Sequence, residues 1–424
     1  MEFTHHPEET TYETIHAFRG NDTKRPPRKR HIVLVLRAKL DRFPSACHHC
    51  QHPAESSQDM MRNGEVSSAI LLGEFNNKAT NLLLRKQRYL CKHCQKTTLA
   101  QTNIVDRHCT ISKTVKHNIR LSLGDMQSQS LIAKRWKVSN SSVQRVLRDA
   151  RAIYKGTQSQ LPEHLAIDEF KSVKSVKHAM SCILMDNLNH ELVEILPGRT
   201  QADLAEYLGR FSIEARREVK TITMDMYSPY LDFLPKYFPN AAIVIDRFHI
   251  VQLILRALNR KRIKVMNNLR YNQPRDYTKL KRLWKQMLKK REDLDFTVYK
   301  SHRLFDGLVT ETMMVEYLIN LDAGLRLAYD YANRLIESLE DNDYTYFDEI
   351  LFESRKYTFP KDMRTMLNTL TKYLPHIKNS FKYTLSNGGV EGMNNKIKLM
   401  KRTGFGYRNF ENLRIRIFLS MQYQ

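Results

Sequence analysis

Three acidic residues, distant from one another along the chain, stand where a metal-dependent enzyme that cuts polynucleotides needs carboxylates. Asp168 lies in HLAIDEFK, Asp225 in TITMDMYSPY and Glu391 in SNGGVEGMNNKIKLM. Cutting a phosphodiester requires an activated oxygen nucleophile and neutralised charge on the leaving oxygen, which two Mg²⁺ ions about 4 Å apart supply together. Mg²⁺, like Mn²⁺, prefers oxygen ligands. We therefore predict that Asp168, Asp225 and Glu391 are catalytic and bind magnesium or manganese.

A second acid–histidine pair occurs in DRFH, which follows the apolar run AAIVI. Asp246 also ends a predicted strand and competes with Asp225 for the second metal position. The predicted fifth strand lies one strand further from the first, about 5 Å in the pairing direction, which favours Asp225. We predict that Asp246 and His249 support catalysis; the alternative is a purely structural hydrogen-bonded pair.

The residues after Glu391 follow a helical pattern. Asn395, Lys398 and Arg402 come at steps of four, three and four, so they share one face with Glu391. The opposite face is apolar and consists of Met393, Ile397 and Met400. We predict that Asn395 and Lys398 support catalysis and that Lys401 and Arg402 bind DNA. The alternative is a solvated amphipathic helix.

Two Cys-x-x-Cys pairs provide four thiolates, the ligand set of a structural, tetrahedral Zn²⁺ site. Cys47 and Cys50 form CHHC, and Cys91 and Cys94 form CKHC. The 40 residues between the pairs require a long hairpin. The alternatives are unliganded buried cysteines or a redox couple, and several histidines nearby could replace a ligand: His48, His49, His52, His93 and His108.

Residues 128–151 show the pattern of a helix-turn-helix. Ser139 is a predicted N-cap between two short helices. The predicted inner faces contain Leu131, Ile132, Ala133, Trp136, Val143, Val146 and Leu147. The outer face of the second helix can offer five residues to a major groove, namely Asn140, Ser141, Gln144, Arg145 and Arg148. The same spacing also occurs in helical hairpins that do not bind DNA.

The middle of the chain alternates short apolar strands with helices. Strands are predicted at 164–170, 179–186, 191–198, 219–225 and 241–246, with helices near 200–215 and 228–236. Three strands, a helix, a strand, a helix and a strand is the order of a ribonuclease H-like fold. The long apolar patterns of 248–385 are helical in spacing and indicate an all-helical insertion.

These patterns predict a multidomain α+β protein, in which a zinc ribbon and a helix-turn-helix precede a ribonuclease H-like α/β catalytic domain interrupted by the helical insertion. The predicted segments are a flexible basic N-terminus at 1–30, the zinc ribbon at 31–108, the helix-turn-helix at 109–155, the catalytic core at 160–250, the insertion at 251–385 and closing helices of the core at 386–424.

The chain is strongly basic. It has 69 Lys and Arg against 45 Asp and Glu, a formal charge of +24. Residues 251–300 hold 15 basic and 4 acidic side chains, whereas residues 301–360 hold 5 and 12, which suggests a helical module with one face for DNA. Such a surplus favours nucleic acid as a partner. No leader and no run of 18 apolar residues is visible, so we expect a cytoplasmic, nucleoid-associated protein without membrane contact.

The sequence resembles the insertion-sequence transposases of the L-three type, a bacterial family with a zinc ribbon, a helix-turn-helix and a DDE catalytic domain. The matching phrases are AIDEF, MDMYSPY, FPNAAIVIDRFHIVQ and SNGGVEGMNNKIKLMKRTGFGYRNFENLRIR. The resemblance implies that the DDE residues are Asp168, Asp225 and Glu391 and that Asp246 and His249 form an Asp-x-x-His motif. The long spacer between the cysteine pairs departs from the family pattern.

For function, the resemblance implies a DNA transposase whose N-terminal modules bind the terminal inverted repeats of an insertion sequence. In related families, hydrolysis at the element ends is followed by attack of the freed 3′ hydroxyl on target DNA. Joining two ends implies at least a dimer on double-stranded DNA. Two alternatives stay open: a catalytically silent DNA-binding regulator derived from a transposase, and a ribonuclease H-like nuclease that does not join strands.

Overall fold

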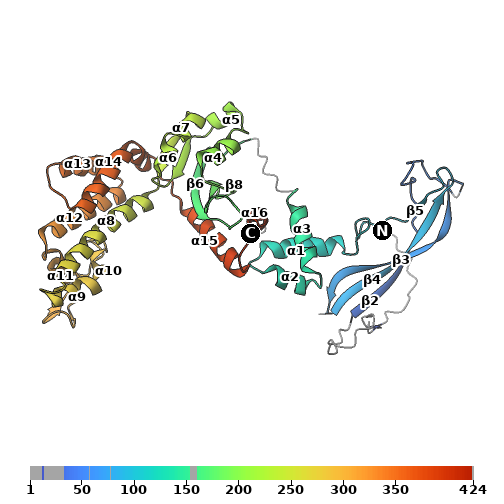
Figure 1. Cartoon of the computed structure of the whole chain (residues 1–424), viewed down its shortest axis with the longest axis horizontal. Coiled ribbons are helices and arrows are strands. Elements are labelled where there is room, and N and C mark those ends of the chain that lie inside the picture. Colours follow the sequence, from blue (N-terminus) through green and yellow to red (C-terminus); the bar gives the residue numbers. More distant parts are fainter. Residues whose placement is uncertain (1–11, 14–32, 57, 77, 153–159, 423–424) are drawn as a thin grey trace. The chain divides into compact units, whose positions relative to one another are not determined.

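The computed structural model describes residues 12–13, 33–56, 58–76, 78–152 and 160–422. The chain forms two compact units, one made of Met1–Lys155 with Ile397–Gln424 and the other of Gly156–Lys396 (Figure 1). Apart from the short strand β1 (Tyr12–Glu13), the N-terminus predicted to be flexible lies outside the described residues. Each unit is described by itself below.

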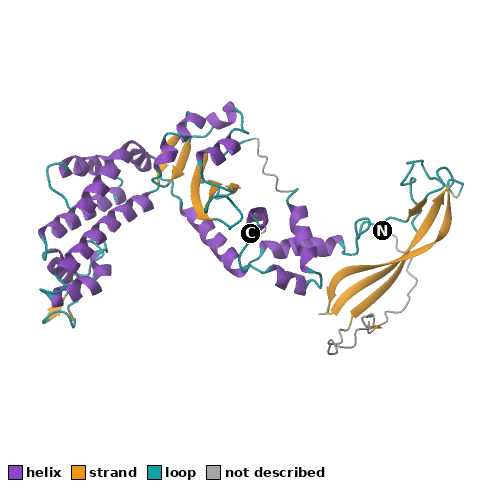
Figure 2. Ribbon diagram, viewed as in Figure 1, coloured by secondary structure: helices purple, strands orange, loops and turns teal. Residues whose placement is uncertain are grey.

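The first unit begins with a twisted sheet dominated by one long hairpin (Figure 2). Its strands are β2 (Val33–Leu40), β3 (Met60–Phe75), β4 (Lys78–Cys91) and β5 (Thr97–Leu99). β3 pairs antiparallel with β4, and β2 pairs parallel with β4. The β3–β4 hairpin fills the long spacer between the two cysteine pairs, as that spacing requires.

Three helices follow the sheet: α1 (Lys113–Gly124), α2 (Gln129–Arg135) and α3 (Asn140–Ala150). Each begins after a serine whose side chain accepts a hydrogen bond from a backbone N–H three residues on, including the predicted cap Ser139. Ile132, Val143 and Leu147 are buried between the helices, as predicted. Leu131, by contrast, is 52% exposed, because it lies on the outer side of the short α2.

The C-terminal helix α16 (Phe410–Gln422) packs on these three helices rather than on the catalytic core to which residues 386–424 were assigned. Ile415 and Leu419 belong to the same buried cluster as α1 and α3. The guanidinium of Arg416, only 1% exposed, donates to the backbone oxygens of Asp125 and Gln127 in the turn between α1 and α2, at 2.8 and 2.9 Å. A buried arginine thus holds a turn almost 300 residues earlier in the chain.

The second unit contains a five-stranded mixed sheet. Its strands are β6 (His164–Lys171), β7 (Met180–Asp186), β8 (Leu192–Leu196), β9 (Thr221–Met224) and β10 (Ala242–Ile245), in the spatial order β10-β9-β6-β7-β8. β6, β7 and β8 pair antiparallel, whereas β9 and β10 run parallel to β6. The helices between β8 and β10 are α4 (Gln201–Leu208), α5 (Ile213–Arg217), α6 (Ser228–Leu231) and α7 (Leu234–Tyr237).

The segment between β10 and the helix carrying Glu391 is almost entirely helical, as predicted. It comprises α8 (Arg247–Asn268), α9 (Pro274–Arg282), α10 (Trp284–Met287), α11 (Glu311–Ile319), α12 (Ala323–Glu340), α13 (Tyr344–Ser354) and α14 (Lys361–Lys382). The only strands among the described residues of this segment form a small hairpin, β11 (Lys300–Ser301) with β12 (Leu308–Val309). α8 begins directly after Asp246, so the insertion starts earlier than the predicted residue 251.

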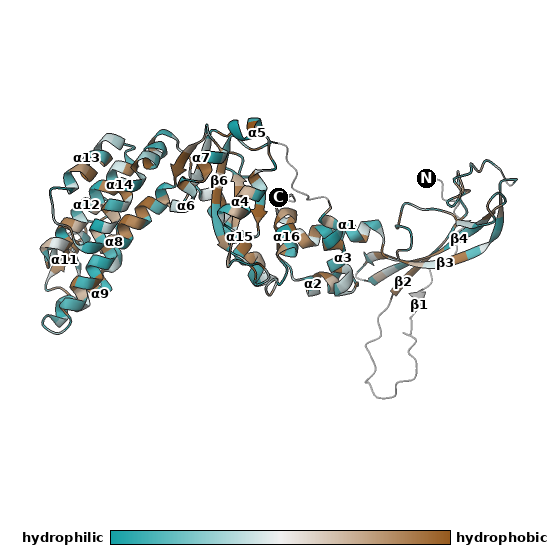
Figure 3. Ribbon diagram, turned by 45° about the horizontal axis from the view of Figure 1, so that its top comes forward, coloured by the Kyte–Doolittle hydropathy of each residue, from teal (hydrophilic) through white to brown (hydrophobic). Residues whose placement is uncertain are grey.

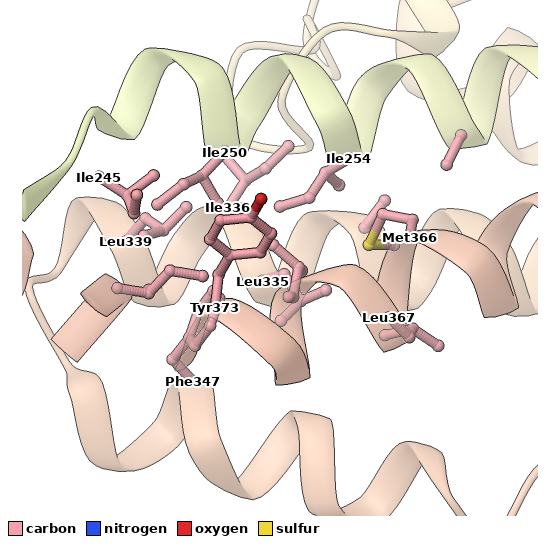
Figure 4. Packing of buried hydrophobic residues seen from close by; sticks show 14 of the residues in the cluster. Ile245, Ile250, Ile254, Leu335, Ile336, Leu339, Phe347, Met366, Leu367 and Tyr373 are labelled. Carbon is pink, nitrogen blue, oxygen red and sulfur yellow. The ribbon is translucent and has the colours of Figure 1, made fainter. Parts of the chain in front are cut away.

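One hydrophobic core runs from the sheet into the insertion. Ile245 at the end of β10 and Ile250 in α8 lie among side chains of α12, α13 and α14 (Figure 4). α14 also covers the edge of the sheet, where Asn379 and Ser380 donate side-chain hydrogen bonds to backbone oxygens of β10. Figure 3 shows the insertion helices carrying apolar and polar stretches side by side. Within the described residues, no helix has the length and apolar character needed to span a membrane.

Candidate active site

Three aspartates form a row across the three parallel strands: Asp168 lies within β6, and Asp225 and Asp246 directly follow β9 and β10. Ala166 of β6 pairs with Thr223 of β9, and two residues further along each strand come Asp168 and Asp225. Ile245 of β10 pairs with Met224, and the next residue of each strand is Asp246 and Asp225. Since neighbouring strands lie about 4.8 Å apart and side chains alternate between faces, the three carboxylates share one face of the sheet.

The carboxylate of Asp168 is partly buried and accepts two hydrogen bonds. The backbone N–H of Glu169 donates to Oδ1 and the Asn394 amide donates to Oδ2, both at 2.6 Å. Burial raises the pKa of Asp168 to about 6, and the charge of Asp225 pushes it in the same direction. A buried carboxylate beside a second one is unfavourable when ionised, and a cation between them relieves this.

His249 lies one turn into α8 and contacts Asp225 from the side of β10. Its Nε2 is 2.8 Å from Asp225 Oδ1 and 4.0 Å from Asp246 Oδ2. The hydrogen bond to Asp225 is the main cause that raises the pKa of His249. Asp246 is buried and caps α8 through the N–H of Phe248, and burial raises the pKa of Asp246. His249 of the DRFH motif is therefore hydrogen-bonded to Asp225, the middle aspartate of the row.

Glu391 reaches the row from α15 (Gly388–Thr403), far away in the sequence. Ligand atoms of Asp246, His249 and Glu391 all lie within 4.8 Å of one another. The backbone N–H of Asn387, just before α15, donates to the Asp246 carboxylate. Gly389 lets the start of α15 approach the loop between β7 and β8, because a Cβ there would collide with the ring of His190. The NGG lead-in thus serves to place Glu391.

Asn394, which the sequence analysis did not single out, is the residue of α15 that contacts Asp168. It lies three residues after Glu391, so both occupy one side of the helix, and its side chain is buried. The apolar residues Met393, Ile397 and Met400 are buried as predicted. The sequence contains two adjacent asparagines after the glutamate, Asn394 and Asn395. The helical spacing from Glu391 singled out Asn395, whereas the residue that contacts Asp168 is Asn394.

The other predicted residues of α15 are Asn395, Lys398, Lys401 and Arg402. Asn395 and Lys398 are exposed, as is Arg402, whereas Lys401 is half-buried. Lys398, Lys401 and Arg402 belong to the part of α15 that groups with the first unit. Their roles in catalysis and DNA binding stay predictions.

A hydrogen-bonded network lies behind Asp168. The guanidinium of Arg199 pairs with the carboxylate of Glu169, and the hydroxyl of Tyr230 donates to Glu169 at 3.3 Å and to the backbone oxygen of Arg199 at 2.9 Å. The Arg199 guanidinium also lies over the ring of Tyr227. The conspicuous phrase MDMYSPY thus supplies Asp225 to the row and Tyr227 and Tyr230 to a network that holds the end of β6.

In the first unit, the four predicted cysteines come together. Cys47 and Cys94 have sulfurs 3.6 Å apart, and those of Cys50 and Cys91 are 3.8 Å apart. A Zn²⁺ tetrahedron with bonds of about 2.3 Å has sulfurs about 3.8 Å apart. Despite its burial, backbone N–H donors of Cys50 and His49 lower the pKa of Cys47 to about 6. The cluster has the geometry and the ligand chemistry of a metal site.

Each cysteine pair belongs to a matching turn. In both, a glutamine follows the second cysteine with positive φ, at Gln51 and Gln95, and its N–H donates to the backbone oxygen of the first cysteine. The repeated Cys-x-x-Cys-Gln was visible in the sequence. The sulfur atoms of the four cysteines all lie within 4.8 Å of one another. Within the described part of this unit, no histidine belongs to that group.

All five residues of α3 that were predicted to bind DNA are exposed. Asn140, Ser141, Gln144, Arg145 and Arg148 lie on the side of α3 opposite to the buried Val143, Val146 and Leu147. The helix offers polar and basic side chains along one face, which suits a groove of DNA.

Comparison with known families identifies the class of protein that carries this site. Residues 165–417, more than half of the chain, match the family of ISL3-type DDE transposases. The chain belongs to this family of insertion-sequence transposases, as the resemblance of its motifs implied. A family of this type implies a bound divalent metal.

Two curated proteins are similar to parts of the chain. The protein named "Transposase for insertion sequence element IS1001" from Bordetella parapertussis is 26% identical over 256 residues, 60% of this chain and 60% of that protein. A protein of Lactococcus lactis subsp. lactis named "ATP-dependent protease" is 35% identical over 111 residues, 26% of this chain and 35% of that protein. The chain thus spans less than two thirds of the length of either relative.

Proposed function

We propose that the protein is the DNA transposase of an insertion sequence, which binds the terminal inverted repeats and catalyses metal-dependent strand cleavage and strand transfer. The second unit is a ribonuclease H-like catalytic domain with a helical insertion. The strand order, three antiparallel strands followed by two parallel ones, supports this assignment. The observation that carries the proposal is that Asp168, Asp225 and Asp246 share one face of the sheet, while Glu391 lies within 4.8 Å of Asp246 and His249.

Asp168, Asp225 and Glu391 would hold two Mg²⁺ or Mn²⁺ ions. The residues fit such ions, since the site gathers hard oxygen donors and the pKa of buried Asp168 is raised, as expected of a group that awaits a cation. Bound there, the ions supply charge neutralisation at the attacking and leaving oxygens. Asn394 and the backbone of Glu169 orient Asp168, while His249 orients Asp225. Asp246 holds the start of α8 and, through Asn387, the start of α15.

The reaction proceeds in two displacements at phosphorus. At the element end, water attacks the phosphorus, the bond to O3′ breaks, and the element strand keeps a free 3′ hydroxyl. That 3′ oxygen then attacks a phosphorus of the target, forming a new P–O3′ bond as the target strand loses its own. In each step the nucleophile, first water and then the 3′ hydroxyl, gives up one proton to solvent, and the leaving 3′ oxygen takes one up from solvent. The row of carboxylates serves both steps, because the two displacements make the same demands on charge.

The N-terminal modules bind the ends of the element. A structural Zn²⁺ held by Cys47, Cys50, Cys91 and Cys94 would fix the far end of the long hairpin. The exposed face of α3 would read the inverted repeat in the major groove through Asn140, Ser141, Gln144, Arg145 and Arg148, and Lys401 and Arg402 would contact backbone. Pairing two ends requires at least a dimer. Because its substrate is DNA, the protein would act at the nucleoid.

A labelled duplex that carries one inverted repeat and its flank tests the proposal. With Mg²⁺ we expect a nick at the end of the repeat and joining of the freed 3′ end to a second duplex, and neither with EDTA. Asp168→Asn, Asp225→Asn and Glu391→Gln should keep end binding and abolish cutting. Glu206→Gln, which removes an exposed carboxylate on α4, should change neither. Cutting without joining would indicate a nuclease, and binding without cutting a regulator; either result contradicts the proposal.

A further inference from the structure

The outer side of α9 and α10 carries four cations on one face. Arg275, Lys281, Arg282 and Lys285 are all exposed. At 100° per residue they fall within about a third of the helical circumference. The opposite side contributes Leu280, Leu283 and Met287 to the core. We call these four residues the basic face; they account for part of the surplus of positive charge counted in 251–300.

The cations of the basic face have no carboxylate partner in the part of the chain that the structure describes. Several other cations of the insertion do pair with carboxylates, as in Lys261–Asp322, Lys264–Asp362, Lys279–Asp276, Lys289–Glu311, Lys290–Glu340, Arg326–Glu316 and Arg334–Glu353. Within the described residues, none of the four cations of the basic face has a carboxylate within ion-pair distance. Four unneutralised like charges on about three turns of helix repel one another, and a polyanion relieves that repulsion.

Aromatic rings border the basic face. The Lys281 ammonium lies 5.5 Å from the ring centroid of Tyr277, and that of Lys285 lies 5.8 Å from Trp284, whose side chain is 40% exposed. Cations alternating with exposed rings are typical of nucleic-acid surfaces. From Arg275 to Lys285 the helix rises about 15 Å, which corresponds to about four phosphates along one strand of duplex DNA.

The basic face is held rigidly relative to the active site. The buried Arg262 of α8 donates to the backbone oxygen of Leu280 in α9 at 2.6 Å, which fastens α9 to α8. α8 itself starts at Asp246 and has 22 residues. Arg262 lies 16 residues after Asp246, about 24 Å along the axis of α8, and the whole helix is about 33 Å long, close to one turn of B-DNA. DNA that runs from the row of carboxylates along α8 would meet the basic face about seven to ten base pairs away.

We propose that the basic face binds the phosphate backbone of the element-end duplex about one helical turn from the cleaved bond, as a second DNA contact in addition to α3. This inference rests on the proposed function. The element end is the occupant we favour because it enters the active site first and is cut there, in the same compact unit. The contact is to backbone and is therefore independent of sequence.

The test is the salt dependence of end binding in the cleavage-deficient Asp168→Asn background. Each lost phosphate contact lowers the slope of log Kd against log [KCl] by about 0.9. We expect Lys281→Gln/Arg282→Gln/Lys285→Gln to reduce the slope by about 2 to 3. The matched control, Lys264→Gln/Lys289→Gln/Lys290→Gln, removes the same charge from ion-paired positions and should keep the parent slope. Hydroxyl-radical protection about one turn from the cut site should disappear only in the first variant.

Three results would overturn the inference: an unchanged slope, an equal change in the control, or normal end binding with a defect confined to capture of target DNA. A parent chain that binds no end duplex would instead refute the proposed function. The thermal melting curves of the two triple variants should match, which excludes unfolding as the cause of a changed slope.

Discussion

Replacing Asp168 by asparagine should make the metal-free protein more stable while it abolishes cleavage. The pKa of Asp168 rises from 3.8 to about 6 because the carboxyl is buried. One pKa unit corresponds to about 1.4 kcal/mol, so at pH 8 the ionised carboxylate costs the folded state about 3 kcal/mol. Asparagine removes this cost but gives up one of the two hydrogen bonds of the carboxylate, about 1 kcal/mol.

The net gain is about 2 kcal/mol at pH 8, which raises the melting temperature of a unit of this size by roughly 4–8 °C. The sign follows from linkage. A carboxyl whose folded pKa is raised is most favourable to folding below its unfolded pKa, and this advantage is lost as the pH rises through about 6. The difference in melting temperature between Asp168→Asn and wild type should therefore become smaller as the pH falls toward 4.

Thermal unfolding in Mg²⁺-free buffer at pH 8 and pH 5 measures the effect, with Glu206→Gln as a control for the loss of an exposed carboxylate on the same unit. Added Mg²⁺ should raise the melting temperature of wild type more than that of Asp168→Asn. The reasoning is refuted if Asp168→Asn is equally or less stable at pH 8, or if its advantage does not depend on pH.

Three further outcomes follow from the described contacts. Metal analysis should find about one zinc per chain, and Cys47→Ser should lose it and unfold the hairpin; a chain without zinc would remove the ribbon assignment. Arg416→Met should destabilise the first unit by about 1 kcal/mol and weaken end binding, because it removes the donor of two hydrogen bonds to part-buried backbone oxygens; unchanged binding in a DNA mobility-shift assay would show that α16 is dispensable. Asn394→Ala should slow cleavage about tenfold and spare end binding, since only the orientation of Asp168 is lost; an unaltered single-turnover rate would assign Asn394 a packing role alone.

The strands and their acids could be predicted from the sequence, because an apolar run indicates a buried strand and a carboxylate within that run or directly after it must lie at the sheet. Asp168, Asp225 and Asp246 come together for this reason. The expectation that Asp225 lies nearer to Asp168 than Asp246 does agrees with the strand order. The four cysteines likewise converge because two equal turns face each other, whatever the length of the hairpin between them.

Contacts between distant helices could not be predicted. Asn394 is one of two adjacent asparagines, and periodicity alone cannot tell which one a strand in another part of the fold will meet. The docking of α16 on the helix-turn-helix depends on Arg416, a residue type that is seldom buried and that polarity patterns assign to solvent. Leu131 was predicted to be buried but is exposed. A helix as short as α2 has few positions that face inward, and Leu131 is not one of them.

The central claim, that Asp168, Asp225 and Glu391 hold a pair of divalent ions against DNA, is tested most directly by counting bound Mn²⁺ with electron paramagnetic resonance on the complex with an element-end duplex. The account predicts two Mn²⁺ per occupied active site in the wild-type complex and the loss of at least one in each of Asp168→Asn, Asp225→Asn and Glu391→Gln. Two Mn²⁺ retained in any of these variants, with DNA still bound, would contradict it.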